Sequence, residues 1–227
     1  MDSQSSQPQP ESTPTPGLTH PPRAARATPV RPHSEDEIGV ALYQPLRTVD
    51  VVLATPERVA ANVDERLGLG RLALVFLIAG VAFTVPYSCV LGIESWWRLT
   101  ALYLGSTLIC LPSLYVFTSY TGTRTTLGQI GVLALLIPAS AAIFTLGFAP
   151  ILEFLLLTME KDSEGVGWSS ISTAMLGVSL GAGVLQLWRC FLGARQQPNP
   201  LLLGLVLVVW HVVFLYVFVR MFTVLEL

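Results

Sequence analysis

Charged residues are scarce in this chain. Asp, Glu, Lys and Arg make up only 12% of its 227 residues, and the formal net charge is −2, whereas an ordinary soluble domain carries about 25% charged residues. The shortage begins after Arg71, where long uncharged segments follow one another. A single soluble core cannot bury so many apolar segments, so we expect lipid around them. The near-neutral balance also argues against a nucleic-acid partner.

Cysteine and catalytic motifs are lacking too. The cysteines are few, scattered in or beside apolar segments and not at metal-ligand spacing: Cys89, Cys110 and Cys190. Such a set excludes a disulfide framework and is typical of small buried hydrophobes. The sequence has no glycine-rich phosphate loop, no HExxH pair and no Ser/His/Asp set at a suggestive spacing. We therefore predict no enzymatic activity, no cofactor, no metal and no catalytic residue.

The chain is rich in long uncharged runs. The first follows Arg71 and is long enough to cross a hydrocarbon core of about 30 Å as a helix. Within it, Pro86 is expected to kink the outer half. The sequence therefore predicts an all-α fold, a polytopic transmembrane helix bundle over residues 71–227. Its spans, about five, are expected at residues 71–93, 98–120, 127–149, 168–190 and 201–220.

The third run, residues 127–159, is unusually long and contains a single charge, Glu153. As one straight helix it would measure about 50 Å, more than the hydrocarbon core. Pro138 and Pro150 offer places to break it. We expect the span to end at Pro150 and an apolar extension, residues 151–159, to lie at the interface or dip partly back. The alternative is one long, tilted and kinked helix.

Two segments precede the spans. Residues 1–45 are rich in Pro, Ser, Thr and Gln and lack the apolar surface that offsets the entropy of ordering, so we predict a disordered tail. The histidines of this tail, His20 and His33, are expected to be solvated.

Residues 46–70 have the pattern of an amphipathic helix that leads into the bundle. Thr55 suits the N-cap and is followed by Pro at the first helical position. Val59, Val63 and Leu67 recur every four residues and form one apolar stripe. The pattern predicts a helix lying on the bilayer surface. The alternative is a helix packed on the loops of the bundle.

The fourth span contains small residues at helical spacing. Gly177 and Gly181 form a GxxxG pair, and Ser179 and Gly183 repeat the spacing. Small side chains let a neighbouring helix approach closely. We expect this contact within the bundle, with a homodimer face as the alternative. The expected partners are thus the lipid bilayer, other membrane proteins or a second copy of the chain.

Three polar residues at membrane depth are functional candidates, because ionisable groups are costly there. Glu153 and Arg220 both fall at the outer ends of spans, and we hypothesise that they form an ion pair. His211 lies near the middle of the fifth span. We expect it to hydrogen-bond a neighbouring helix rather than to transfer protons or bind metal.

Basic residues near the span ends predict the orientation. With the N-terminus in the cytoplasm, six arginines lie inside and three basic residues outside, so we expect the C-terminus outside. The inner set is Arg58, Arg66, Arg71, Arg124, Arg189 and Arg195, and the outer set is Arg98, Lys161 and Arg220. The preference for Arg over Lys suggests a GC-rich bacterium and hence its inner membrane.

From Leu46 onward the chain resembles the bacterial branch of the YIP-type (Ypt-interacting protein) membrane domain family. The resemblance is carried by four segments, residues 50–58, 67–71, 111–117 and 148–150, and by five closely spaced spans. It implies a five-span bundle. Eukaryotic proteins of this type resemble membrane-trafficking factors that contact small GTPases. The resemblance transfers no catalytic residue.

Two functions therefore remain open. The first is a membrane-organising or partner-binding scaffold without catalysis. The second is a small transporter or channel component with a site near the broken third span, because proline-broken helices can expose backbone to a site. The position of Glu153 distinguishes them: a water-accessible cavity favours transport, and a place at the headgroups favours the scaffold.

Overall fold

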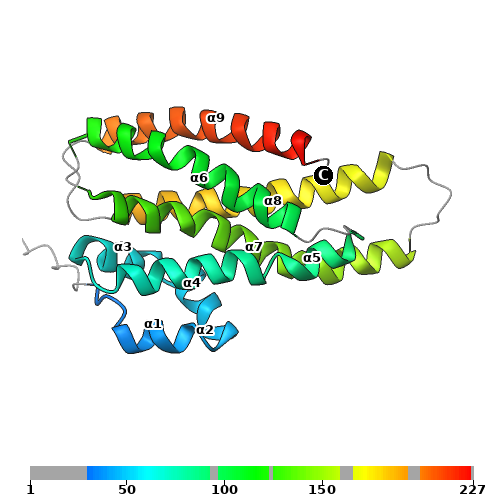
Figure 1. The fold of residues 1–227 in the computed structure, drawn as a ribbon, viewed down its shortest axis with the longest axis horizontal. Coiled ribbons are helices and arrows are strands. Elements are labelled where there is room, and N and C mark those ends of the chain that lie inside the picture. Colours follow the sequence, from blue (N-terminus) through cyan, green and yellow to red (C-terminus); the bar gives the residue numbers. More distant parts are fainter. Residues whose placement is uncertain (1–29, 93–96, 123–124, 159–165, 194–199, 226–227) are drawn as a thin grey trace, which may run out of the picture.

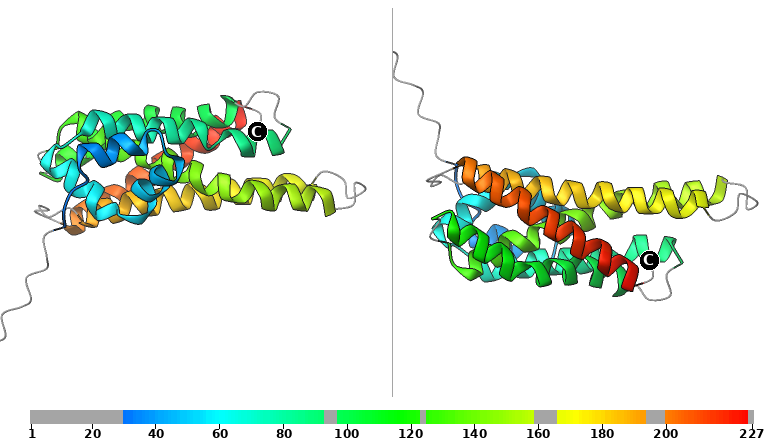
Figure 2. Two further views of the ribbon diagram at one scale, coloured as in Figure 1. Left: turned by 90° about the horizontal axis from the view of Figure 1, so that it is seen from below. Right: turned by 90° about the horizontal axis from the view of Figure 1, so that it is seen from above.

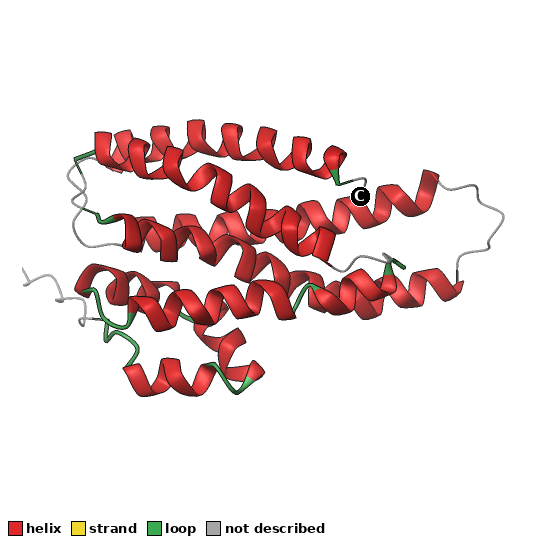
Figure 3. Cartoon of the chain, in the orientation of Figure 1, coloured by secondary structure: helices red, strands yellow, loops and turns green. Residues whose placement is uncertain are grey.

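A computed structural model describes residues 30–92, 97–122, 125–158, 166–193 and 200–225, and in these ranges the regular structure is entirely helical (Figures 1 and 3). A group of short helices comes first and forms what we call the lead, residues 30–67. It comprises α1 (Glu35–Ala41), α2 (Pro45–Val49), a π-helical turn η1 (Asp50–Ala54) and α3 (Pro56–Glu65).

Long helices follow the lead and form the bundle: α4 (Leu69–Ala82) with α5 (Val85–Val90), α6 (Trp97–Tyr120), α7 (Leu127–Thr158), α8 (Val166–Gly193) and α9 (Pro200–Val224). Five candidate spans, with α4 and α5 counted together, are long and apolar enough to cross a membrane in the described part of the chain. The predicted multi-pass helical fold is thus confirmed, and the boundaries differ from the expected ones by a few residues, except at the end of α7. Helix α7 is the most deeply buried of the five and packs against α4, α6 and α8 (Figure 2).

The third run is one helix, so the predicted break at Pro150 is wrong and the alternative of a long helix is confirmed. Both Pro138 and Pro150 lie inside α7. Helices α7 and α8 pack together more extensively than any other pair of elements in the described part of the chain. Their ends project together beyond the neighbouring helices (Figure 1). Each proline removes one hydrogen bond, whereas ending a helix in lipid exposes several backbone groups.

The first span is interrupted where its sequence predicted a kink. Helix α4 ends at Ala82 and Pro86 lies in the first turn of α5. Between them, the Thr84 hydroxyl lies 2.8 Å from the Val81 carbonyl and 2.8 Å from the Thr100 hydroxyl on α6. This side chain therefore satisfies backbone freed by the interruption and joins α4 to α6.

The small residues of α8 divide between two faces. An ideal Cβ added to Gly183 would lie 2.5 Å from the Ile137 carbonyl oxygen on α7, so only glycine permits this approach. Gly177 and Gly181 are exposed, and a Cβ on either meets nothing within 4 Å. Close packing inside the bundle is confirmed for Gly183 and wrong for the GxxxG pair, because the rotation of α8 turns that pair outward.

The lead is more ordered than its composition predicted. Residues 35–41, expected within the disordered tail, form α1, because Ser34 and Glu37 cap its first turn reciprocally and Ile38 and Ala41 are buried. Residues 1–29, including His20, lie outside the described residues.

The amphipathic helix also differs from its prediction. Val59 and Val63 of α3 are buried, and α3 packs against α8 and α7. These two residues of the stripe face protein, whereas Leu67 lies beyond the end of α3 and is 41% exposed. The prediction of a helix on the bilayer surface is therefore wrong for α3, and the alternative holds in that α3 packs on the bundle, though on its helices rather than its loops.

Candidate functional site

A polar cluster lies in the lead, centred on His33. The Ser34 cap that starts α1 places His33 immediately before the helix, where its backbone groups have no helical partner. The Asn62 side chain of α3 supplies both partners. Its Oδ1 accepts from the His33 N–H at 2.7 Å, and its Nδ2 donates to the His33 carbonyl at 2.9 Å. Asn62 is fully buried, so this amide clamps the start of α1 onto α3.

The His33 ring belongs to the same network. Its Nε2 lies 3.0 Å from the Thr55 hydroxyl and its Nδ1 lies 3.4 Å from Oε2 of Glu37. That carboxylate oxygen also accepts from Nη2 of Arg58 at 2.9 Å. The Arg58 Nε donates in turn to the Arg31 carbonyl at 3.0 Å. Two separate stretches of the lead, residues 31–37 and 55–62, thus converge on one network.

The electrostatics of the network favour a neutral imidazole and an ionised carboxylate. His33 is only 4% exposed. Burial lowers its pKa below the ordinary 6.5, the Arg58 charge lowers it further, and Glu37 and Asp50 oppose this more weakly. The pKa of Glu37 is lowered from 4.5, chiefly by the backbone N–H of Ser34 and also by Arg58. The expectation of a solvated His33 is wrong, because the fold of α1 onto α3 buries it.

A cavity of about 350 Å³ opens beside the cluster. Its walls carry charges of both signs and two valines: His33, Asp36, Glu37, Val40, Arg47, Asp50, Val51 and Arg58. Glu37 and Arg58 are paired with each other, whereas no ion pair within the described residues engages Asp36, Arg47 or Asp50. The cavity can therefore offer charges of both signs to a polar partner.

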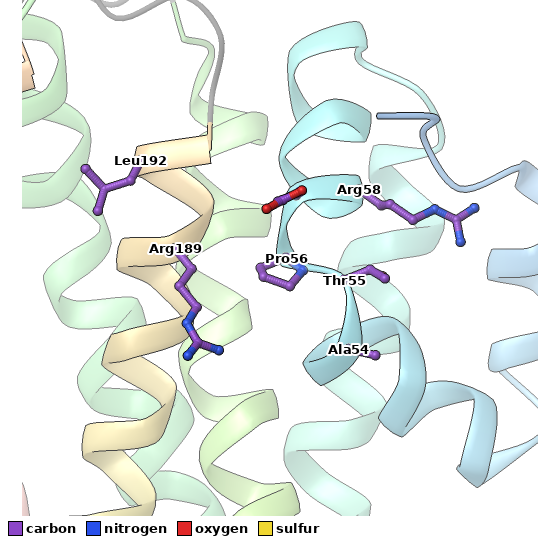
Figure 4. Close-up of a pocket in the computed structure, with 7 residues that line it drawn as sticks. Ala54, Thr55, Pro56, Arg58, Arg189 and Leu192 are labelled. Atoms are coloured by element: carbon purple, nitrogen blue, oxygen red, sulfur yellow. The ribbon is translucent and has the colours of Figure 1, made fainter. Parts of the chain in front are cut away.

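A second cavity, of about 610 Å³, separates the lead from α8 (Figure 4). It is lined by Ala54, Thr55, Pro56, Glu57, Arg58, Arg189 and Leu192. Arg189 extends from α8 into the gap, whereas Arg58 points to the other side of α3 (Figure 4). Because Arg58 lines both cavities, the two form a charged zone around the start of α3.

Hydrogen bonds from the bundle hold this zone in place. Because η1 ends at Ala54, its last carbonyls have no donor in a following turn of the same helix and need other donors. Gln186 of α8 donates to the Leu53 carbonyl at 2.9 Å, and the Cys190 thiol donates to the Pro56 carbonyl at 3.3 Å. At the other end of α3, Gln129 of α7 donates to the Val63 carbonyl. The lead is thereby a fixed part of the bundle.

The residues selected from the sequence do not assemble into a site. Glu153 and Arg220 are both exposed, on α7 and α9, and no ion pair in the described part of the chain joins them. The hypothesis of a pair is therefore wrong, because α9 packs on α6 rather than on α7. Neither residue lines the two cavities described above.

His211 is held by its own helix. Its Nδ1 lies 2.5 Å from the Leu207 carbonyl oxygen. The centroid of its ring lies 5.9 Å from that of Trp188 on α8 and 5.1 Å from that of Trp210. The expected hydrogen bond to a neighbouring helix is made instead by Trp210, whose Nε1 donates to the Cys110 carbonyl of α6 at 3.1 Å. Among the described residues no group of three potential ligands is placed to hold a metal.

The cluster around His33 was missed because its surroundings have the composition of a disordered tail. One local signal was available: Ser34 and Glu37 have the spacing of a capping box before apolar residues.

Comparison of the chain with protein-family models, with curated proteins and with solved structures finds no match in any of the three.

Proposed function

We propose that this protein is a non-catalytic membrane scaffold whose lead is a binding platform for another protein. The observation that carries the proposal is the attachment of the lead to the bundle. Side chains of α7 and α8 donate to backbone carbonyls of the lead, and the lead presents the charged zone at its surface. A charged surface that is fixed to a membrane bundle is suited to recruiting a polar partner.

The alternative of a transporter receives less support. Glu153 lies on the outside of α7 and lines neither cavity. Buried hydroxyls such as those of Thr107, Thr145 and Ser179 donate to carbonyls of their own helices. Each of these hydroxyls has thereby used its one donor within its own helix.

The resemblance to the YIP-type family agrees with a scaffold that contacts a soluble partner. We further propose that the lead faces the cytoplasm of a bacterial inner membrane, as the distribution of arginines favours. Three of the basic residues used for that inference, Arg124, Lys161 and Arg195, lie outside the described residues. The exposed Gly177 and Gly181 face is proposed as a contact for another transmembrane helix.

A charge-reversal pair tests the platform. Asp50 lines the smaller cavity, whereas Asp64 is exposed on α3 and lines neither of the two cavities. Proteins crosslinked to the wild-type chain in its native membrane should be lost from Asp50→Lys and retained by Asp64→Lys. Equal capture by both variants would refute the platform.

In proteoliposomes, proton or ion flux above that of empty vesicles would refute the scaffold and favour transport.

A further inference from the structure

The turn between α1 and α2 exposes large apolar side chains. Tyr43 and Leu46 are 85% and 84% exposed, and Val40 in the last turn of α1 is 45% exposed. Fully burying a large apolar side chain is worth about 1.5–3 kcal/mol. The lead buries Val59 and Val63 of α3, which the sequence pattern assigned to lipid, and leaves this turn uncovered.

The turn lies beside a transmembrane helix. Helix α1 packs against α4, and Glu35 in its first turn pairs with Arg71 near the start of α4 at 3.1 Å. From that pair both helices run in the same direction, so the α1–α2 turn lies farther along α4 (Figure 1). Arg71 is the last charged residue before the uncharged run of the first span. The six residue steps of α1 from Glu35 to Ala41 span about 9 Å, so the α1–α2 turn begins up to that far beyond the level of Arg71.

Helix α4, on which α1 packs, carries exposed apolar side chains of its own. Leu74, Leu77 and Ile78 of α4 are exposed, and a membrane-spanning helix presents such a face to acyl chains. The polarity of α1 changes along its axis in the same sense. Its acidic residues lie in the first turn and its exposed apolar residues at the end. This gradient matches the change from headgroups to acyl chains across one leaflet.

We propose that the α1–α2 turn is a membrane wedge that inserts Tyr43 and Leu46 into the bilayer. The occupant of this surface is phospholipid, at the depth of the glycerol groups and upper acyl chains. A tyrosine ring suits that depth because it combines an apolar body with a polar hydroxyl. The wedge goes beyond the scaffold function, because it assigns lipid rather than protein to this part of the lead.

Spin labels test the depth of the wedge directly. A nitroxide is attached at Tyr43→Cys in the full chain with its three native cysteines replaced by serine, reconstituted in vesicles of phosphatidylcholine and phosphatidylglycerol. Collision with oxygen, which concentrates in the bilayer, is compared with collision with a water-soluble nickel chelate. Leu74→Cys provides the lipid reference and Asp36→Cys, at the acidic end of α1, provides the water reference. The oxygen-to-nickel ratio at position 43 should shift from the Asp36 value toward the Leu74 value.

Two outcomes of the spin-label experiment would overturn the wedge. A ratio at position 43 equal to that at position 36 places the turn in water. A label shielded from both reagents with dipolar broadening between chains means that a second copy, not lipid, covers the turn. Leu46→Cys gives an independent measurement at an equally exposed position. Elution of each variant from a size-exclusion column in mild detergent, at the same volume as the wild-type chain, confirms that it is folded. No partner protein enters this experiment, so its result is separate from that of the platform test.

Discussion

Replacing Gly183 by alanine should separate α7 from α8 and destabilise the bundle. The added Cβ would lie 2.5 Å from the Ile137 carbonyl oxygen and 3.3 Å from the Ile137 carbonyl carbon. Backbone atoms cannot rotate away as a side chain can, so the helices must shift. Overpacking of this kind costs about 1–3 kcal/mol.

Gly181→Ala on the same helix is the matched control. A Cβ there meets nothing within 4 Å, and both changes share the intrinsic preference of a helix for alanine over glycine, about 1 kcal/mol in water. The difference between the variants therefore isolates the clash. In mild detergent, Gly183→Ala should melt below Gly181→Ala by about 2–4 °C for each kcal/mol. Equal midpoints would refute the close approach of α8 to α7.

Three further predictions concern the lead. Asn62→Ala leaves two buried backbone groups of His33 unpaired and should release α1 at a cost of about 2–6 kcal/mol, seen as faster amide hydrogen exchange over residues 33–41. Asp64→Ala, exposed on the same helix, should leave exchange unchanged, and equal effects of the two variants would contradict the clamp. Because the pKa of His33 is lowered in the folded lead, the unfolded lead binds a proton at a higher pH than the folded one. The stability that His33 contributes is therefore complete above pH 6.5 and is lost as pH falls through the lowered pKa. The lowered pKa of Glu37 causes a further loss of stability below pH 4.5. Limited proteolysis in α1 should therefore accelerate from pH 7.5 to 5.5, relative to an unstructured reference peptide, and His33→Gln should flatten that dependence; an unchanged slope would exclude His33 as its source. Gln186→Leu removes the donor to the Leu53 carbonyl and should cost about 1–3 kcal/mol, whereas Leu185→Ala, at an exposed neighbouring position, should have little effect on the melting temperature in mild detergent.

Much of the fold follows from local sequence. The number and approximate limits of the spans are predictable because transfer of an uncharged helix into lipid depends on the length and composition of the segment itself. The interruption near Pro86 is predictable for a related reason, since proline acts on its own helical turn. The continuity of α7 across Pro150 was not predictable from the sequence, because it depends on how far α8 packs along α7.

The candidate site shows the same division. Ser34 and Glu37 mark a helix start within a segment that is otherwise polar and proline-rich, and composition outweighed that local signal. Nothing near His33 in the sequence points to Asn62 or Arg58, because these partners reach it only when the lead folds and brings α3 to the start of α1. Conversely, Glu153 and Arg220 were selected for their charge at membrane depth, yet their helices do not pack together.

The sequence by itself determined that this chain is an all-helical, multi-pass membrane protein, because hydrophobic length and charge are properties of each segment. Only the tertiary structure decided which faces of those segments meet. It turned Gly183 inward and Gly181 outward on one helix, buried Val59 and Val63 of α3 against protein, and left Tyr43 and Leu46 of the α1–α2 turn exposed. The physical reason is that such choices depend on contacts between residues far apart in the chain, which periodicity along one helix does not encode.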